Sequence, residues 1–280
     1  MNSNAPAPCL CGTRCDTTPF YCRGPVDYVR SNTCGLIFRQ NPDDAAYDAA
    51  YFDERKFNQW AEAQDVLIPA RLAQIAAFFP TDAPVRLLEV GGGRGSFIKH
   101  VVKTSWDVTV VEPNKVAHDF LTATYKVPVR SSVVELPLAA FDVVHLNHVL
   151  EHIKDPIGTL KLLRERLRPG GIIWIEVPCE LFMYRIMKVF DALSFGANSP
   201  TRIYEPTHAV LYTTRTLQHV LERAGFSGVN VTWTGWCDPA RRAAFYTQLP
   251  PTSRLLAEIC RFTLLDKWLD GGWLIATAKA

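Results

Sequence analysis

The sequence lacks several features that would assign it to a class at once. No segment of the 280 residues approaches the roughly 18 uninterrupted apolar residues that a membrane-spanning helix needs. The N-terminus, "MNSNAPAPCLCG", has neither the basic start nor the apolar run of a secretory signal. No charge sign is in surplus, because 30 basic residues face 28 acidic ones. These absences argue against a membrane span and a nucleic-acid partner, and they predict a cytoplasmic, reducing location.

Cysteine is scarce except at the N-terminus. Five of the eight cysteines fall within the first 34 residues: Cys9, Cys11, Cys15, Cys22 and Cys34. In a reducing compartment such cysteines are typically free thiols or metal ligands rather than disulfides. The surrounding sequence is rich in proline and turn-forming residues and has no helical periodicity. We therefore predict a small module over residues 1–42 that needs a metal to hold it together and has a hydrophobic core of its own.

The remaining chain shows two patterns. Residues 43–80 carry apolar side chains at helical spacing and predict a helical connector that covers the active site. From residue 81 to 280, largely apolar segments such as "VRLLEV", "DVTVVEP" and "FDVVHLN" alternate with amphipathic ones. This alternation predicts an α/β fold with a Rossmann-like, doubly wound parallel sheet covered on both faces. Residues 179–208 and 238–270 interrupt the alternation and are expected to be insertions, the second containing an amphipathic helix.

A glycine-rich turn follows the first predicted strand, in "RLLEVGGGRGSFIKHV". Such a turn lets the backbone approach a ligand closely, and the next helix offers unpaired N–H groups. The glycines follow G-x-G-x-G, and Ser96 stands where a dinucleotide-binding motif requires glycine. No Lys-Ser/Thr pair of a phosphate-binding loop follows. Glu112, about 20 residues on, ends the second strand, where a carboxylate can accept from ribose hydroxyls.

These segments, together with "FDVVHLNHVLEHIKDP", "LRPGGIIWIEVP" and "LERAGF", resemble class I S-adenosylmethionine-dependent methyltransferases over about residues 84–235 and the last strand. The resemblance implies a seven-stranded sheet and a cofactor site. The methionine part would be held by Glu89, Gly91, Gly93 and Gly95. The ribose and adenine would be held by Glu112, Pro113, Asn114, and the backbone at Ser132 and Val133. The residues expected to face the cofactor after the fourth strand are Asn147, His148 and Val149.

The N-terminal cysteines resemble the zinc-binding module that precedes some small-molecule and sugar methyltransferases. "CLCG", "CGLIF" and "YFDERKF" carry the resemblance. The match is degenerate, because the first pair is C-x-C and Ser31 replaces the cysteine expected before Cys34. Zinc typically takes four thiolate or imidazole ligands. The ligand set that the resemblance implies is Cys9, Cys11, Cys22 and Cys34, with Cys15 as a substitute for Cys11. The alternative is a lapsed site with free thiols.

Methyl transfer to a hydroxyl or acidic carbon also requires a proton acceptor, and histidine suits this task near neutral pH. His208 is our candidate general base, because "RIYEPTHAVLYTT" resembles the acceptor-side segment of the same sugar methyltransferases. Tyr204 and Glu205 would line the acceptor pocket beside it. His152, in "NHVLEHI", is the second candidate, with a role in the pocket wall as its alternative. His145, inside a predicted strand, is expected to be structural.

The sequence therefore predicts an enzyme that transfers a methyl group from S-adenosylmethionine to a small polar acceptor, such as a sugar nucleotide or a natural-product intermediate. Three alternatives stay open at this point. They are a methyltransferase with a protein or lipid-linked acceptor, a nucleotide-dependent oxidoreductase, and a non-catalytic binding module. The intact Glu89, Gly91, Gly93 and Glu112 argue against the last of these. The sequence does not specify the acceptor, the methylated atom or the oligomeric state.

Overall fold

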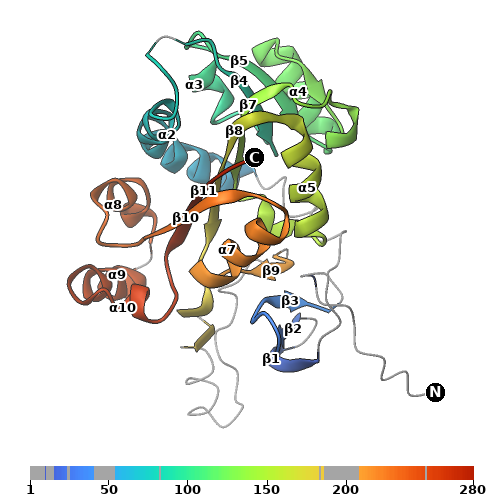
Figure 1. The fold of residues 1–280 in the computed structure, drawn as a ribbon. Helices are drawn as coiled ribbons and strands as arrows, with labels where there is room; N and C mark the ends of the chain where they lie inside the picture. Colours follow the sequence, from blue (N-terminus) through green and yellow to red (C-terminus); the bar gives the residue numbers. More distant parts are fainter. Residues whose placement is uncertain are drawn as a thin grey trace.

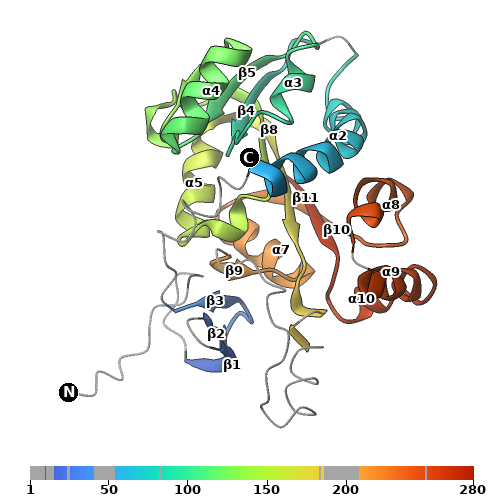
Figure 2. The ribbon, with the colours of Figure 1, turned by 180° about the vertical axis from the view of Figure 1, so that it is seen from behind.

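The structure is a computed structural model of the 280-residue chain. It describes residues 10, 16–23, 26–40, 54–81, 83–182, 184–185, 208–249 and 251–280. Within these ranges the chain forms two sheets, one large and one small, with helices packed around the large one (Figures 1 and 2).

The large sheet has seven strands in the order β10-β11-β8-β7-β4-β5-β6. Six of its seven strands span Arg86–Val90 (β4), Asp107–Val111 (β5), Val129–Arg130 (β6), Phe141–Asn147 (β7), Leu167–Pro178 (β8) and Trp273–Lys279 (β11). The seventh strand, β10, spans Ser227–Thr234. The strands β4 to β8 pair in parallel, and β11 pairs antiparallel to both β8 and β10. The predicted Rossmann-like, doubly wound seven-stranded sheet is confirmed.

Helices cover both faces of this sheet. One face packs on residues of α2 (Glu54–Ala76), α3 (Ile98–Val101) and α4 (Lys115–Tyr125), in a cluster that includes Ile68, Ile98 and Leu121. The other face packs on α5 (Pro156–Arg166) and α7 (Thr214–Arg223), through Leu160 and Leu217 among others. Because both faces are buried, the central strands are largely apolar, and the exceptions, among them Glu89, His145 and Glu176, are buried polar residues.

The helix ends follow local sequence signals. The side chain of Asn114 caps α4 by accepting from the N–H groups of Val116 and Ala117. A Thr213–Thr216 capping box starts α7, and Asp155 caps α5 ahead of a proline at its first position. These caps place the loops at the carboxyl ends of the strands, where ligands bind in this architecture.

The small sheet joins three strands near the N-terminus to one strand far along the sequence. Its strands are β1 (Thr17–Arg23), β2 (Val26–Ser31), β3 (Ile37–Arg39) and β9 (Val210–Leu211), paired antiparallel in that order. Side chains alternate between its faces. Val29, Phe38 and Val210 join the core of the large sheet, whereas Tyr28, Ile37 and Leu211 pack with Leu181 and Tyr184. The prediction of a separate N-terminal core was therefore wrong, because these strands bury one face against the main core.

The insertion at 238–270 is helical, with α8 (Pro239–Phe245), α9 (Pro251–Thr263) and α10 (Leu265–Trp268), and a short 3-10 turn at Tyr246–Gln248. The expected single amphipathic helix is broken at Leu264, whose φ of 53° lies in the left-handed region. Helix α8 packs against α2 through Ala63, Leu67 and Ala244. Within the described ranges, no helix combines the length and the apolar composition needed to cross a membrane.

Candidate functional site

The glycine turn after β4 adopts the backbone conformation that the motif requires. Gly91, Gly93 and Gly95 have φ values of 76°, 53° and 79°, which side chains other than glycine's rarely adopt. A Cβ on Gly91 would lie 2.5 Å from Val149 Cγ2, and one on Gly95 would lie 2.3 Å from the Tyr125 ring. The turn is thus wedged between the segment after β7 and helix α4, and no larger residue fits at either position.

Glu112 lies directly after β5 and ties that strand to the glycine turn. Its Oε2 accepts from the Gly93 N–H at 2.8 Å, and its Oε1 accepts from the Asn114 N–H at 2.9 Å. Burial raises the pKa of this carboxyl, and the two backbone N–H groups oppose the shift. Each carboxylate oxygen keeps a second lone pair that a ribose hydroxyl could use. Pro113, the residue between Glu112 and Asn114, is exposed.

Glu89 points into the protein. Its Oε2 contacts Nδ1 of His145, whose ring is stacked between Phe97 and Trp174 with centroids 3.9 and 4.9 Å away. Burial raises the pKa of Glu89 well above its ordinary value and lowers the pKa of His145 well below its own. Both directions favour a neutral hydrogen-bonded pair. His145 is completely buried, as expected for a structural histidine.

The end of β7 and the residues that follow it connect the glycine turn to the remaining candidate residues. Asn147 pairs with Glu176 of the neighbouring strand β8, and its Nδ2 donates to Gln64 of α2 at 3.5 Å. His148 has a φ of 53°, an uncommon value for a residue with a side chain, and its N–H donates to the Glu176 carbonyl. The side chain of Val149 packs against Gly91, as described above. The predicted trio therefore lies at the carboxyl end of β7.

Ser132 and Val133 lie farther along the same edge, beyond β6. The Ser132 hydroxyl caps the short 3-10 helix Val133–Glu135 by accepting from Val134 N–H. The Val133 carbonyl already accepts from Arg166 Nε at 3.1 Å. The Ser132 carbonyl likewise accepts from the Glu135 N–H at 3.3 Å, and an adenine contact at either residue stays a prediction.

Sequence reasoning missed a buried charged network at the end of β8. Glu176 accepts from Arg71 of α2 at 3.1 Å and from Arg241 of α8 at 2.6 Å, and Arg71 also donates to Gln64 at 3.0 Å. Although burial alone would raise it, the charges of Arg71 and Arg241 hold the pKa of Glu176 well below its usual value. His148 Nε2 is 3.5 Å from the same carboxylate. A lone glutamate inside the apolar run "IIWIEVP" was the sequence signal for this network.

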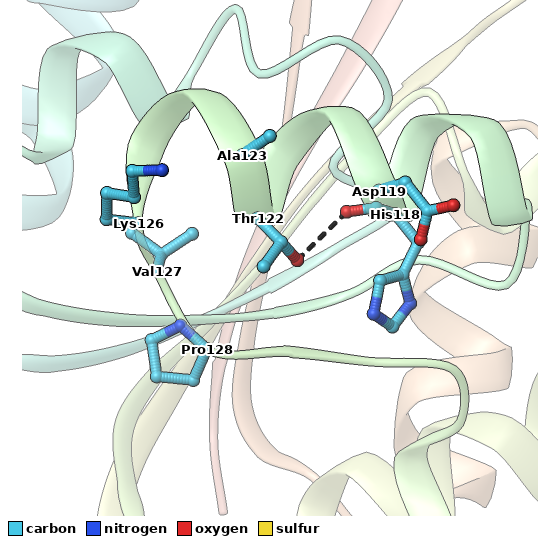
Figure 3. Close-up of a pocket in the computed structure, with 7 residues that line it drawn as sticks. All are labelled: His118, Asp119, Thr122, Ala123, Lys126, Val127 and Pro128. Carbon is cyan, nitrogen blue, oxygen red and sulfur yellow. Dashed lines mark hydrogen bonds between the residues drawn. The ribbon is translucent and has the colours of Figure 1, made fainter.

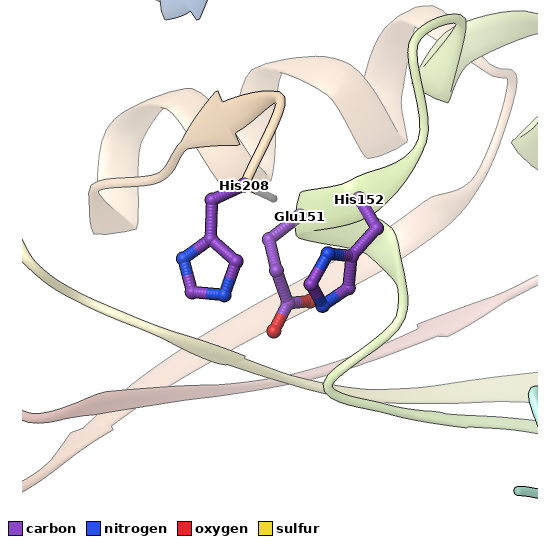
Figure 4. Close-up of side chains that lie close together, drawn as sticks. All are labelled: Glu151, His152 and His208. Atoms are coloured by element: carbon purple, nitrogen blue, oxygen red, sulfur yellow. The ribbon is translucent and has the colours of Figure 1, made fainter. Parts of the chain in front are cut away.

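Glu151, His152 and His208 come together at the far end of this segment (Figure 4). One nitrogen or oxygen atom from each of the three side chains lies within 4.8 Å of those of the other two, and the two imidazole rings meet edge to face with centroids 4.8 Å apart. Glu151 Oε1 is 3.2 Å from His148 Nδ1, while Oε2 has no hydrogen-bond partner among the described residues. Burial raises the pKa of Glu151, but His148, His152 and His208 outweigh it and leave the pKa below its ordinary value. Residues of these types can handle a proton or hold a metal ion.

The pairing of His208 with Glu180 was also missed. Glu180 follows β8, and its Oε2 lies 2.7 Å from His208 Nδ1. The backbone of His208 is fixed as well, because the Tyr28 hydroxyl donates to its carbonyl at 2.7 Å. Local sequence patterns do not reveal either contact, since Glu180 is 28 positions and Tyr28 is 180 positions from His208.

Several predicted residues lie outside the described residues. Among the expected zinc ligands these are Cys9, Cys11 and Cys15, and for Cys22 only the backbone is described. Tyr204 and Glu205 also lie outside the described residues. Cys34 is described, and its thiol donates to Ser31 Oγ at 3.3 Å. The predicted zinc set and acceptor pair therefore remain predictions.

Buried polar atoms support a ligand at the carboxyl ends of the strands. Among the described residues, Gln64 Nε2, Asn147 Oδ1 and Glu151 Oε2 are buried and have no hydrogen-bond partner. An unpaired buried polar group costs about 1–3 kcal/mol, so such groups call for a partner. Together with the glycine turn and Glu112, these donors and acceptors fit a polar nucleoside ligand such as S-adenosylmethionine.

A separate hollow lies on the outer side of α4 and the turn that follows it (Figure 3). It is lined by His118, Asp119, Thr122, Ala123, Lys126, Val127 and Pro128. Most of these residues are exposed, and the Thr122 hydroxyl already donates to the His118 carbonyl. The hollow lacks the buried polar groups that distinguish the site at the strand ends.

Comparison with known proteins agrees with this geometry. A family described as "Methyltransferase domain" matches residues 51–231. A ubiquinone biosynthesis O-methyltransferase of Caulobacter vibrioides is 26% identical over 164 residues, covering 51% of this chain and 63% of the relative. A tRNA U34 carboxymethyltransferase of Chromohalobacter salexigens is 31% identical over 159 residues, covering 52% of this chain and 45% of the relative. The chain thus spans less than two thirds of either relative.

Solved structures resemble the fold at lower identity. A SAM-dependent methyltransferase from Archaeoglobus fulgidus matches with a TM-score of 0.54 and 20% identity, over 85% of this chain and 100% of that one. The [4+2]-cyclase SpnF matches with a TM-score of 0.52 and 19% identity, over 77% and 80% of the two chains. Since a protein described as a cyclase shares this architecture, the chemistry has to be argued from the site.

Proposed function

The chain belongs to the methyltransferase-domain family, and from this premise we propose that it transfers a methyl group from S-adenosylmethionine to a small polar acceptor. The family match favours this activity over the nucleotide-dependent oxidoreductase that the glycine turn alone left open. The acceptor class is a sugar nucleotide or a natural-product intermediate, in keeping with the resemblance of the N-terminal and His208 segments to sugar methyltransferases. A protein or lipid-linked acceptor is the alternative.

The observation that carries the proposal is the joined glycine turn and Glu112. The turn lets the backbone approach the ligand, and the Glu112 carboxylate accepts from the ribose hydroxyls while two N–H groups hold it in place. Asn147 and Gln64 supply unpaired polar atoms beside it. S-adenosylmethionine brings a sulfonium, whose methyl group is the electrophile of the reaction. The protein then has to align the acceptor and receive its proton.

His208 is the proposed general base. Its ring lies in the cluster with Glu151 and His152, and its Nδ1 is engaged by Glu180, so Nε2 is the atom that would receive the acceptor's proton. The new bond forms between the acceptor atom and the methyl carbon as the carbon–sulfur bond breaks. His152 is proposed as a wall of the same pocket, and Tyr204 and Glu205 as further acceptor contacts.

A structural zinc ion on residues 1–42 is the second part of the proposal. Cys34, the one ligand of the expected set whose side chain the structure describes, faces Ser31. The small sheet is held to the main core by its own packing and by the β3–β9 pairing, so the metal would brace the N-terminal segment internally. Elemental analysis of protein purified without chelator should find about one zinc per chain. Freely titratable thiols in metal-free protein would instead mean that the site has lapsed.

Calorimetric titration with S-adenosylhomocysteine tests the cofactor assignment. We expect saturable binding to the parent protein and an affinity for Glu112→Ala that is about 10- to 150-fold weaker, since a charged hydrogen-bond acceptor is worth roughly 1.5–3 kcal/mol. NAD is the control ligand and should not bind. Tight NAD binding with no response to S-adenosylhomocysteine would overturn the proposal.

A further inference from the structure

The contact between Glu180 and His208 has the geometry of a carboxylate that orients an imidazole. Glu180 Oε2 and His208 Nδ1 are 2.7 Å apart, within ordinary hydrogen-bond range. Both side chains are largely shielded, with 18% of Glu180 and 11% of His208 exposed. A neutral imidazole that donates from Nδ1 presents its lone pair at Nε2, so the carboxylate selects the tautomer of the ring.

The frame around the pair is rigid. The Tyr28 hydroxyl fixes the His208 carbonyl at 2.7 Å, and the next residue, Ala209, donates its N–H to the Glu151 carbonyl at 2.7 Å. The Ala209 carbonyl in turn accepts from the Arg39 N–H at 2.9 Å. Three separate elements therefore hold the backbone beside His208, and the remaining freedom of the ring is rotation about its side-chain bonds. The bond to Glu180 removes that freedom.

We propose that Glu180 is the positioning residue of the general base: it holds His208 in the Nδ1–H tautomer with Nε2 turned toward Glu151 and His152. This inference rests on the proposed function, because His208 must be the base. In the transfer step the acceptor O–H bond breaks and the proton goes to Nε2, while the acceptor oxygen bonds the methyl carbon as the carbon–sulfur bond breaks and its electron pair stays on the sulfur of S-adenosylhomocysteine. The Glu180 carboxylate, hydrogen-bonded to the ring, stabilises the imidazolium that forms.

The charged and titratable groups around His208 come from four elements. Glu180 follows β8, and Glu151 and His152 lie on the 3-10 turn Leu150–His152. Tyr28 and Arg39 approach from β2 and β3 of the small sheet. Of these, Glu180 is the carboxylate hydrogen-bonded to the ring. Removing its charge should make His208 harder to protonate, so the acid limb of the pH–rate profile should move to lower pH.

The experiment compares Glu180→Gln and Glu180→Ala in the full-length protein. The glutamine can still accept from Nδ1–H but carries no charge, so kcat/KM should fall modestly and its acid limb should shift to lower pH. The alanine removes both the hydrogen-bond acceptor and the charge. It should lower kcat by about 10-fold or more, within the range expected for a positioned base. Glu222→Gln, at an exposed position on α7, is the matched control. S-adenosylhomocysteine affinity and thermal stability should stay at parent values.

Nitrogen NMR of imidazole-labelled protein supplies a readout that needs no acceptor. The His208 signal, assigned by its loss in His208→Ala, should report Nδ1–H in the parent and a changed tautomer in Glu180→Ala. An Nε2–H tautomer in the parent overturns the proposal. The proposal is also overturned if Glu180→Gln leaves the acid limb of the pH–rate profile unshifted and Glu180→Ala keeps full turnover. If His208→Ala itself keeps full turnover, the base assignment fails instead.

Discussion

The proposed site has two halves that are assembled in different ways. The half proposed to bind the cofactor is made of Glu89 to Gly95 and Glu112 to Asn114. It contains contacts over short or moderate separations in sequence, such as Glu112 with Asn114, two positions away, and with Gly93, 19 positions away. The acceptor half, made of Glu151, His152, Glu180 and His208, depends on partners 28 and 180 positions apart. The first half is a local motif, whereas the second exists once the whole chain has folded.

The largest effect expected from breaking the acceptor half alone is on turnover. His208→Ala should lower kcat by about 10²–10⁴-fold, because the acceptor's proton loses its receiver. S-adenosylhomocysteine affinity, measured by calorimetry, should remain unchanged because the cofactor half is intact. His152→Ala, the paired variant, should instead reduce stability or cofactor affinity. Parent-rate turnover by His208→Ala on a confirmed acceptor would remove His208 from the mechanism and favour an acceptor that is already a free amine or thiolate.

The next effect concerns the buried network that links α2 and α8 to the end of β8. Arg241→Ala should lower the free energy of unfolding by about 1.5–3 kcal/mol, because the completely buried Glu176 loses one of its two charged hydrogen-bond donors and keeps only Arg71. The neighbouring Arg242 pairs with Glu258 at the surface, so Arg242→Ala should cost at most about 1 kcal/mol. Urea denaturation of the two variants measures the difference. Equal losses would mean that the network is not a stabilising link between the helices and the sheet.

The smallest expected effect is a pH dependence of the free energy of unfolding. It arises from His145, which is buried beneath the cofactor half. His145 has a folded-state pKa well below its ordinary value, so the unfolded chain binds a proton near pH 6.5 that the folded chain refuses. Stability from this residue is therefore complete above about pH 6.5 and falls as the pH decreases, by at most about 1.4 kcal/mol per pH unit. Glu176, with its depressed pKa, should add a further loss below about pH 4.5.

Urea unfolding of His145→Gln at a series of pH values checks this dependence. The contribution of His145, a stability that rises with pH between about pH 4.5 and 6.5, should be lost in the variant because its side chain does not titrate, so the slope should decrease by up to about 1.4 kcal/mol per pH unit. Glu89 acts in the opposite direction, since its raised pKa makes the folded state hold a proton that the unfolded state releases above about pH 4.5. An unchanged slope in the variant would place the titrating group elsewhere.

The fold and the cofactor half could be predicted from one sequence because their signals are local. The glycine turn, the strand ending at Glu112 and the cap at Asn114 each depend on residues within one strand–turn–helix unit. The alternation of apolar and amphipathic segments likewise specified the sheet strand by strand. Some helix boundaries differ from the predicted ones. At Leu264, a left-handed backbone conformation ends α9. Such ends depend on single backbone torsions rather than on periodicity.

The acceptor half could not be predicted to the same depth. His208 and His152 were recognised as chemically suitable, but Glu180 had no motif around it, and Arg71 and Arg241 belong to helices outside the resemblance to known motifs. Their common partner, Glu176, lies in an apolar strand where a charge must be paired. That rule implies that partners exist, but it does not name them. The prediction of a separate N-terminal core also failed because it depended on a contact between distant parts of the sequence. Strand β3 pairs with β9, which lies far along the chain.

The pairing of β3 with β9 also has a consequence for the order of events during synthesis. The Tyr28 hydroxyl and the His208 carbonyl that it holds are 180 positions apart. At about 5–20 residues per second, the N-terminal strands leave the ribosome roughly 10–40 s before their last partner strand exists. During that interval the edge of β3 is without its neighbour, while the glycine turn and its strands can already form. The segments proposed to bind the cofactor can therefore form before the segments proposed to bind the acceptor are complete.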